Sequence, residues 1–175
     1  MAVQPILIYG NPLLHKKAVT VEEINDEIQT LVDNMFQTMI EARGIGLAAI
    51  QIGVEKSVIV IDLPQEDGDE NNNNNSMLAM INPELIDLQG MCTIEEGCLS
   101  VPGINADIDR PETITVQYVN TNNETIEMKC SGLLARVIQH EYDHLQGILF
   151  IKHLKPSVRK KLAPQLRQLA KGVEV

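Results

Sequence analysis

The sequence predicts an α+β protein with a long amphipathic helix near its N-terminus, antiparallel strands in its middle, and two helices toward its C-terminus. The strands are predicted by two runs of alternating polar and apolar residues, 113–119 and 124–130, which four turn-forming residues join in the pattern of a β-hairpin. The helices are predicted by apolar residues at helical spacing in 24–40 and by apolar residues on several sides of a helix in 131–147. We expect residues 1–175 to form a single domain.

Composition restricts the classes of function. A hydrophobic content of 44% suits a globular core. No apolar run is long enough to span a bilayer and no signal peptide is evident, so we expect a cytoplasmic protein without membrane contact. Three cysteines, an odd number, do not indicate a disulfide framework. The net charge of -10 argues against nucleic acid as the main partner.

The first long helix is expected to begin near Thr20-Val21-Glu22-Glu23. This tetrapeptide has the form of a capping box, in which the first and last side chains bind free backbone N–H groups at a helix start. Apolar residues follow at helical spacing from Ile24 to Ile40, and the pattern stops at Gly44. Its methionine and phenylalanine side chains are interpreted as core.

A glycine-rich run, Gly44-Ile45-Gly46-Leu47-Ala48-Ala49-Ile50-Gln51-Ile52-Gly53, follows this helix. Small residues alternate there with apolar ones, which lets the backbone approach another group closely. Gln51, taken alone, is more typical of a turn than of a catalytic group. Residues 57–63 then indicate a buried strand. Residues 64–76, which include an unbroken run of asparagines, predict a mobile acidic loop outside the core.

The strongest chemical signal is the pattern His-Glu-x-x-His, formed by His140, Glu141 and His144 inside a predicted helix. Residues four positions apart share one face of a helix, so the two imidazoles converge on one point and suit a divalent metal ion. Glu141 lies beside that point, where metal-dependent hydrolases use a glutamate to accept a proton from the attacking water. A chance pattern on a solvated helix is less favoured, because the surrounding apolar residues indicate a buried helix.

A second chemical signal is Glu95-Glu96-Gly97-Cys98-Leu99-Ser100-Val101-Pro102-Gly103. A glycine before Cys98 and a proline after it predict a constrained loop, in which a thiolate can be aimed at a metal. A catalytic metal site normally has three protein ligands and one open position. Cys98 is the best third ligand, and His153, Asp143 and Glu96 are weaker options.

The C-terminal segment is locally basic. Its basic residues are Lys152, Lys155, Arg159, Lys160, Lys161, Arg167 and Lys171, half of the chain's 14 Lys and Arg residues. Pro156 suits the start of a helix, and Pro164 is expected to break or kink it. We expect a basic helix over 155–172, which is either a solvated face or a docking surface for a polyanion.

Three motifs together resemble those of peptide deformylases in order and approximate spacing: Gly44 to Gln51, Glu96 to Ser100, and Gln139 to Gly147. The resemblance implies a fold in which antiparallel β-sheets pack around the central metal-binding helix. It also implies an enzyme that removes the N-terminal formyl group from formylmethionyl nascent polypeptides and releases formate.

The resemblance also assigns roles to individual residues. It makes Cys98, His140 and His144 the metal ligands and Glu141 the general base and acid. The side-chain amide of Gln51 and the backbone N–H of Leu99 become the donors to the oxyanion. The substrate-binding residues that it implies are Gly46 and Gly97 beside the peptide backbone, and Ile45, Leu47 and Leu133 around the methionine side chain.

Members of this family typically hold Fe(II) in the cell and tolerate Zn, Ni or Co, and a Cys-His-His set suits iron and zinc equally. Because the implied substrate is a nascent chain, the basic segment 155–172 is a candidate for docking to the ribosome. Many bacterial members have an arginine where this chain has Asn105, so we expect an altered substrate affinity or preference.

Two alternatives use parts of the same motifs. A zinc metallopeptidase needs only His-Glu-x-x-His, predicts a further His or Glu ligand downstream, and gives Cys98 no role. A non-catalytic, metal-stabilised binding module needs neither Glu141 nor Gln51, and its metal usually has four protein ligands.

Overall fold

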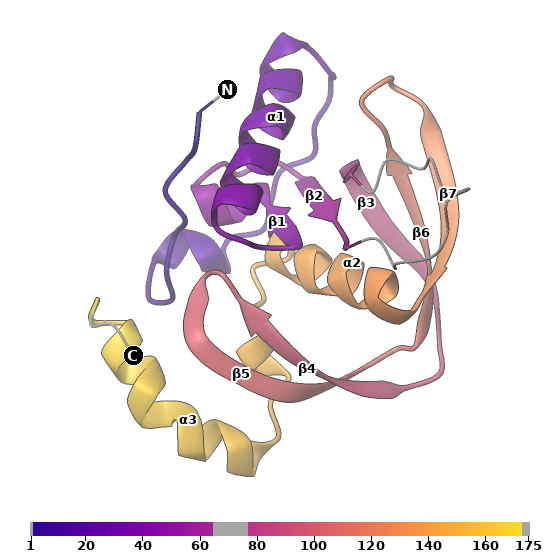
Figure 1. Ribbon diagram of the computed structural model, residues 1–175. Helices are drawn as coiled ribbons and strands as arrows, with labels where there is room; N and C mark the ends of the chain where they lie inside the picture. Colours follow the sequence, from indigo (N-terminus) through magenta and orange to yellow (C-terminus); the bar gives the residue numbers. More distant parts are fainter. Residues whose placement is uncertain (1, 65–76, 173–175) are drawn as a thin grey trace.

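The computed structural model describes residues 2–64 and 77–172, and its main feature is one helix enclosed by two antiparallel sheets (Figure 1). The five-stranded sheet has the order β1-β2-β3-β6-β7 and is formed by β1 (Gly46–Ala48), β2 (Val58–Asp62), β3 (Met77–Gln89), β6 (Thr113–Val119) and β7 (Thr125–Ser131). The two-stranded sheet is the hairpin of β4 (Cys92–Cys98) and β5 (Val101–Arg110). The helices are α1 (Asp26–Glu41), α2 (Gly132–Leu145) and α3 (Pro156–Leu169), with short 3-10 helices η1 (Pro12–His15), η2 (Ala49–Ile52) and η3 (Phe150–Lys152). The predicted α+β class is confirmed.

Helix α2 is the enclosed helix. It begins directly after β7 and packs against β1, β2, β6 and β7. Its side chains Ala135, Val137, Ile138 and Leu145 share a core cluster with the inner face of the large sheet. The helix ends before Gly147, whose φ of 71° is the left-handed conformation expected of a glycine just beyond a helix. Because the β4–β5 hairpin covers the other side of α2, the polar residues of this helix are held away from bulk water (Figure 1).

The hairpin differs from the sequence expectation of a constrained loop around Cys98. Strand β4 runs up to Cys98, which pairs with Val101 across a two-residue turn. Along β5 the buried positions alternate, at Val101, Ile104 and Ala106 among others, and they pack toward Phe150. The register of the hairpin therefore fixes the thiol at its tip.

Helix α1 lies against β1 and β2 and buries Val32, Met35 and Met39 there. It begins later than predicted. Asn25 is the N-cap, and its side chain accepts hydrogen bonds from the N–H groups of Glu27 and Ile28. The capping box predicted at residues 20–23 is therefore wrong.

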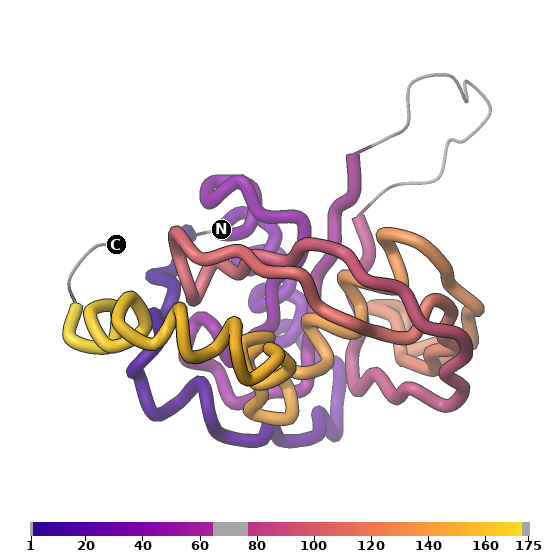
Figure 2. Tube along the Cα trace, turned by 90° about the horizontal axis from the view of Figure 1, so that it is seen from below, coloured from indigo at the N-terminus to yellow at the C-terminus, as the bar shows by residue number. Residues whose placement is uncertain are grey.

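Helix α3 begins at Pro156 as predicted and continues through Pro164, so of the two predicted effects of this proline, a break or a kink, the break does not occur. Leu166 and Leu169 attach it to a core cluster that also contains Phe150. Figure 2 shows that α3 runs outward from the large sheet and ends near the N-terminal segment. The loop predicted over 64–76 lies outside the described residues except for Pro64. None of the helices within 2–64 and 77–172 has the length and apolar character of a membrane span.

Candidate metal centre

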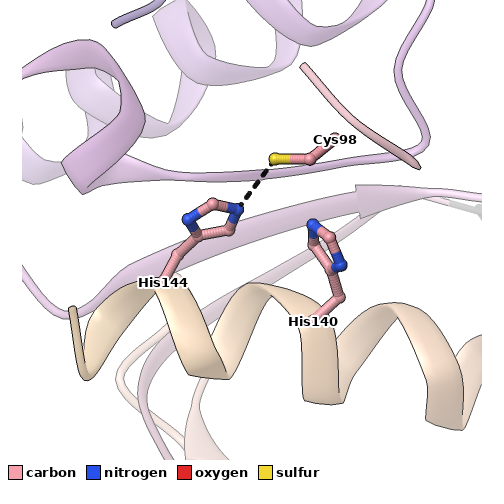
Figure 3. A group of neighbouring side chains, drawn as sticks. All are labelled: Cys98, His140 and His144. Atoms are coloured by element: carbon pink, nitrogen blue, oxygen red, sulfur yellow. Dashed lines mark hydrogen bonds between the residues drawn. The ribbon is translucent and has the colours of Figure 1, made fainter. Parts of the chain in front are cut away.

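Cys98, His140 and His144 direct their ligand atoms to one point between α2 and the tip of the β4–β5 hairpin (Figure 3). These atoms lie within 4.8 Å of one another, and Sγ of Cys98 is 3.2 Å from Nε2 of His144. The two imidazoles stand on successive turns of α2, and Cys98 approaches from the opposite side (Figure 3). Ligands at about 2.0–2.3 Å from a metal lie at such separations, so one thiolate and two imidazoles fit a single metal ion.

Glu141 lies beside this cluster with an atom that is free to take a proton. The residue is 4% exposed, and its Oε2 is buried without a hydrogen-bond partner among the described residues. Burial raises the pKa of Glu141 to about 7. Strand β1 passes so close that a Cβ on Gly46 would stand 2.5 Å from Oε1 of Glu141. The glycine therefore keeps the space around the carboxylate open.

The amide of Gln51 has a fixed orientation toward the cluster. Its Oε1 accepts a hydrogen bond from the N–H of Ala48 at 2.7 Å, so its Nε2 points the other way. That nitrogen donates to Oγ of Ser100 at 3.2 Å and lies 3.7 Å from Sγ of Cys98. Ser100 was not among the predicted site residues. The side-chain N–H donor of Gln51 thus lies beside the metal ligands, the place that the resemblance implied, although Gln51 taken alone was more typical of a turn.

A cavity of about 470 Å³ opens beside the cluster. Its walls are the segment from Arg43 to Gly46, the hairpin around Gly97, and one face of α2. The predicted residues that line it are Ile45, Gly46, Gln51, Gly97, Cys98, Leu99, Leu133, His140 and Glu141. Leu47 does not line it, contrary to expectation. Side chains alternate along a strand, so Leu47 points toward α1 and is fully buried there.

Glu96 was a weaker option for a metal ligand, but the structure gives it a different place. Its Oε2 is 3.0 Å from Nδ1 of His140, which donates this bond because an ionised carboxylate only accepts. Arg110 donates to both carboxylate oxygens, at 2.7 and 3.1 Å, and Arg136 donates to Oε1 at 2.8 Å. Burial alone would raise the pKa of Glu96, but the bonds from His140 and Arg110 hold it far below its usual range. Glu96 therefore orients His140 and leaves Nε2 of that ring for a metal.

Asp143 and His153, the other weaker options, bond to each other instead. Oδ2 of Asp143 lies 2.7 Å from Nε2 of His153 and 2.7 Å from Nη1 of Arg110. Burial opposes ionisation of Asp143, but these two partners together lower its pKa. Arg110 was not identified from the sequence. Its only signal there is the alternation of β5, which assigns it to the buried face.

Comparisons with known proteins find similar chains over nearly the whole length of this one. The polypeptide deformylase family matches residues 3–160. The chain is 46% identical to the peptide deformylase of Thermodesulfovibrio yellowstonii, covering 91% of this chain and 94% of that protein. It is also 46% identical to peptide deformylase 2 of Xanthomonas campestris pv. campestris, covering 99% of both. Similar solved structures include peptide deformylase from Legionella pneumophila, with 37% identity, a TM-score of 0.85, and coverage of 97% of this chain and 96% of that chain. Another is peptide deformylase from Ehrlichia chaffeensis in complex with actinonin, with 38% identity and a TM-score of 0.86. The match covers 96% of this chain and 98% of that chain.

Proposed function

The chain belongs to the peptide deformylase family, enzymes that remove the formyl group from N-formylmethionyl polypeptides, and we propose that Cys98, His140 and His144 hold the metal for this reaction. The single observation that supports this most strongly is the convergence of the three ligand atoms beside Glu141, whose buried Oε2 has no partner within residues 2–64 and 77–172. When bound, the metal supplies Lewis acidity toward water and the formyl oxygen.

Glu141 is the general base and then the general acid. Its Oε2 takes a proton from the attacking water and gives it to the nitrogen of the departing amine, so that formate and a free N-terminus result. A carboxyl whose pKa is raised to about 7 by burial suits both steps, because it exchanges a proton readily near neutral pH. The open space over Gly46 allows the reacting group to lie against this carboxylate.

Gln51 and Leu99 stabilise the negative charge that develops on the formyl oxygen. Nε2 of Gln51 is fixed toward Cys98 by the hydrogen bond that its own Oε1 accepts. Leu99 follows Cys98 in the hairpin turn and lines the cavity, so its backbone N–H is the second donor. Donors that are oriented before the reaction stabilise an oxyanion more than water does.

The methionine side chain occupies the cavity between Ile45 and Leu133. Ile94 and Val137, which the sequence did not single out, also line this space. The peptide backbone runs between β1, an edge strand of the large sheet, and the hairpin residue Gly97. An edge strand has free N–H and C=O groups that bind an extended peptide.

The metal in the cell is proposed to be Fe(II), with zinc or nickel as stable replacements. Thiolate and imidazole ligands accept all three, so the ligand set permits each of them. Metal analysis of protein purified anaerobically from its native host should find iron. Zinc alone in such a preparation, with full activity, would overturn this assignment.

Formate release tests the activity. Metal-loaded protein should release formate from formyl-Met-Ala-Ser and should not act on acetyl-Met-Ala-Ser, because the acetyl group is larger than the formyl group for which the site is proposed. A zinc peptidase would instead liberate Ala or Ser, and a binding module would leave both peptides intact. Either result would contradict the proposal.

The basic C-terminal helix is proposed to dock on the ribosome, where the nascent chain emerges in the cytoplasm. Arg159, Lys160 and Lys161 are exposed on α3. Deleting α3 would also remove Leu166 and Leu169 from the core, so charge removal is the cleaner test. Glutamine at the three basic positions should reduce co-sedimentation with ribosomes, whereas Lys129→Gln on β7 should not. Unchanged sedimentation of the triple variant would exclude this helix as the docking surface.

A further inference from the structure

Arg43 is an exposed cation at the rim of the reaction cavity. It lines this cavity together with Gly44, Ile45 and Gly46. Its guanidinium has no hydrogen bond or ion pair with any residue in the described part of the chain. The other arginine of the cavity wall, Arg136, is 3% exposed and bonded to Glu96. Arg43 is thus the cavity arginine whose charge is available to a peptide that enters from solvent.

The backbone at Arg43 is unusual for a residue with a side chain. Its φ is 56°, in the left-handed region that glycine and asparagine adopt most readily. The position follows the C-cap of α1, where the N–H of Arg43 bonds to the carbonyl of Ile40 and that of Gly44 bonds to Met39. A glycine is the common residue at such a helix end. The chain therefore carries an arginine where backbone geometry favours glycine.

The chain separation between Arg43 and Gly46 sets an upper limit on the distance of Arg43 from the reaction centre. Gly46 touches Glu141, and Arg43 is three residues farther along the wall, which places it at most about 10 Å away along the chain. An extended substrate advances about 3.3 Å per residue, so its second or third residue reaches the level of Arg43. On the facing wall, Glu95 lies three residues before Cys98 and is also exposed.

We propose that Arg43 determines substrate specificity by favouring an acidic side chain at the second or third residue after the formyl group. This inference rests on the proposed function, since it places the formylmethionine at Glu141 and Cys98. Successive side chains of an extended peptide point to opposite sides, so one of these two positions faces Arg43 and the other faces the wall of Glu95. The chain has a net charge of -10, so Arg43 supplies a local attraction that the molecule as a whole does not.

The test compares peptides that differ in charge at one position. The set is formyl-Met-Glu-Ser, formyl-Met-Lys-Ser, formyl-Met-Ala-Glu and formyl-Met-Ala-Lys, all amidated at the C-terminus so that no terminal carboxylate binds Arg43. The readout is the ratio of kcat/KM for Glu over Lys at each position, measured on the metal-loaded enzyme. A ratio within one enzyme is independent of its metal content and of its overall activity.

Two variants remove the charge in different ways. Arg43→Gln keeps a polar side chain, and Arg43→Gly also relaxes the backbone, so a folding defect does not explain a change that both share. At one of the two positions, each variant should lower the Glu/Lys ratio roughly two- to fivefold, the effect of one exposed ion pair. Arg43→Glu should lower it further, and 0.5 M NaCl should remove the difference between wild type and variants. Lys129→Gln, on the exposed surface of β7, should keep the wild-type ratio.

The outcomes separate this inference from the activity on which it rests. Equal Glu/Lys ratios at both positions in wild type and Arg43→Gln would overturn the role of Arg43, while turnover of formyl-Met-Ala-Ser still supports the deformylase activity. Absence of turnover of formyl-Met-Ala-Ser by the metal-loaded wild type would overturn the proposed function and, with it, the role of Arg43.

Discussion

The site beside α2 has a side that faces the cavity and a side that faces the β4–β5 hairpin, and the two differ in whether buried polar atoms are hydrogen-bonded. Toward the cavity, Oε2 of Glu141 is buried without a partner among the described residues. Toward the base of the hairpin, both oxygens of Glu96 are hydrogen-bonded, and Arg110 joins Glu96 to Asp143. Buried charges are tolerated when they are paired, and leaving one unpaired is costly. The difference separates a supporting side, where the carboxylates of Glu96 and Asp143 are paired with arginine, from a reacting side that keeps the acceptor of Glu141 free for water and substrate.

Glu141→Gln should have the largest effect, because it removes the base from the reacting side without touching the supporting side. We expect the rate of formate release to fall about 10²–10⁴-fold, the usual contribution of a positioned acid or base. Metal content should stay at the wild-type level, since Cys98, His140 and His144 are unchanged. Turnover close to wild type would show that Glu141 is not the proton acceptor.

Arg110→Met should have the next largest effect, on stability. It leaves Glu96 and Asp143 as buried carboxylates that have lost a partner. The free energy of unfolding should fall by about 3–5 kcal/mol. Urea denaturation measures this, with Arg159→Met on the surface of α3 as a control that should stay within about 0.5 kcal/mol of wild type. A loss below 1 kcal/mol would mean that the supporting side is not held by this arginine.

Glu96→Gln tests whether the supporting side acts on the metal site. An amide keeps the shape but binds Nδ1 of His140 less strongly than a carboxylate does. Metal affinity should fall about 10–100-fold, as is typical when the partner of a ligating histidine is changed. Competition with a chelator measures this change. An unchanged affinity would indicate that His140 is oriented by packing alone.

His153→Leu should have the smallest effect, because it removes only the outer end of the network. The His153 side chain is 36% exposed, and Asp143 keeps its bond to Arg110. A partner at the surface contributes about 1 kcal/mol or less, which corresponds to a decrease in Tm of about 2–4 °C at this size. Thermal denaturation of the metal-loaded protein provides the measurement. A decrease in stability as large as that caused by Arg110→Met would show that His153, at the surface, is also needed to hold Asp143 and Arg110 in place.

The sequence predicted the reacting side better than the supporting side for a physical reason. His140 and His144 converge because of helix geometry, which spacing in the chain already determines. Arg110 reaches Glu96 across 14 residues only because the register of β4 and β5 places them together, and no local pattern encodes that register. The same holds for Cys98, which was expected in a loop although its strand pairing fixes it.

Two other differences have local causes. The start of α1 was misplaced because two sequences competed for the cap, and Asn25 forms the hydrogen bonds that Thr20 was expected to form. The resemblance to deformylases assigned Leu47 to the substrate cavity, but a shift of one residue along β1 turns a side chain to the other face of the sheet. The first error moves a helix start by five residues, from Thr20 to Asn25, and the second concerns one side chain.

The close approach of β1 to α2 limits how this protein can change. At Gly46, a single methyl group would stand 2.5 Å from Oε1 of Glu141 and 2.8 Å from Cγ1 of Val137. Every other amino acid carries at least that group, so no replacement fits unless the side chains of Glu141 and Val137 shift from their positions in the site. Directed evolution of this scaffold toward new acyl groups therefore has almost no freedom at Gly46. Substitutions that change the acyl specificity have to be made in the outer wall of the cavity, where Ile45 and Leu133 are exposed to solvent.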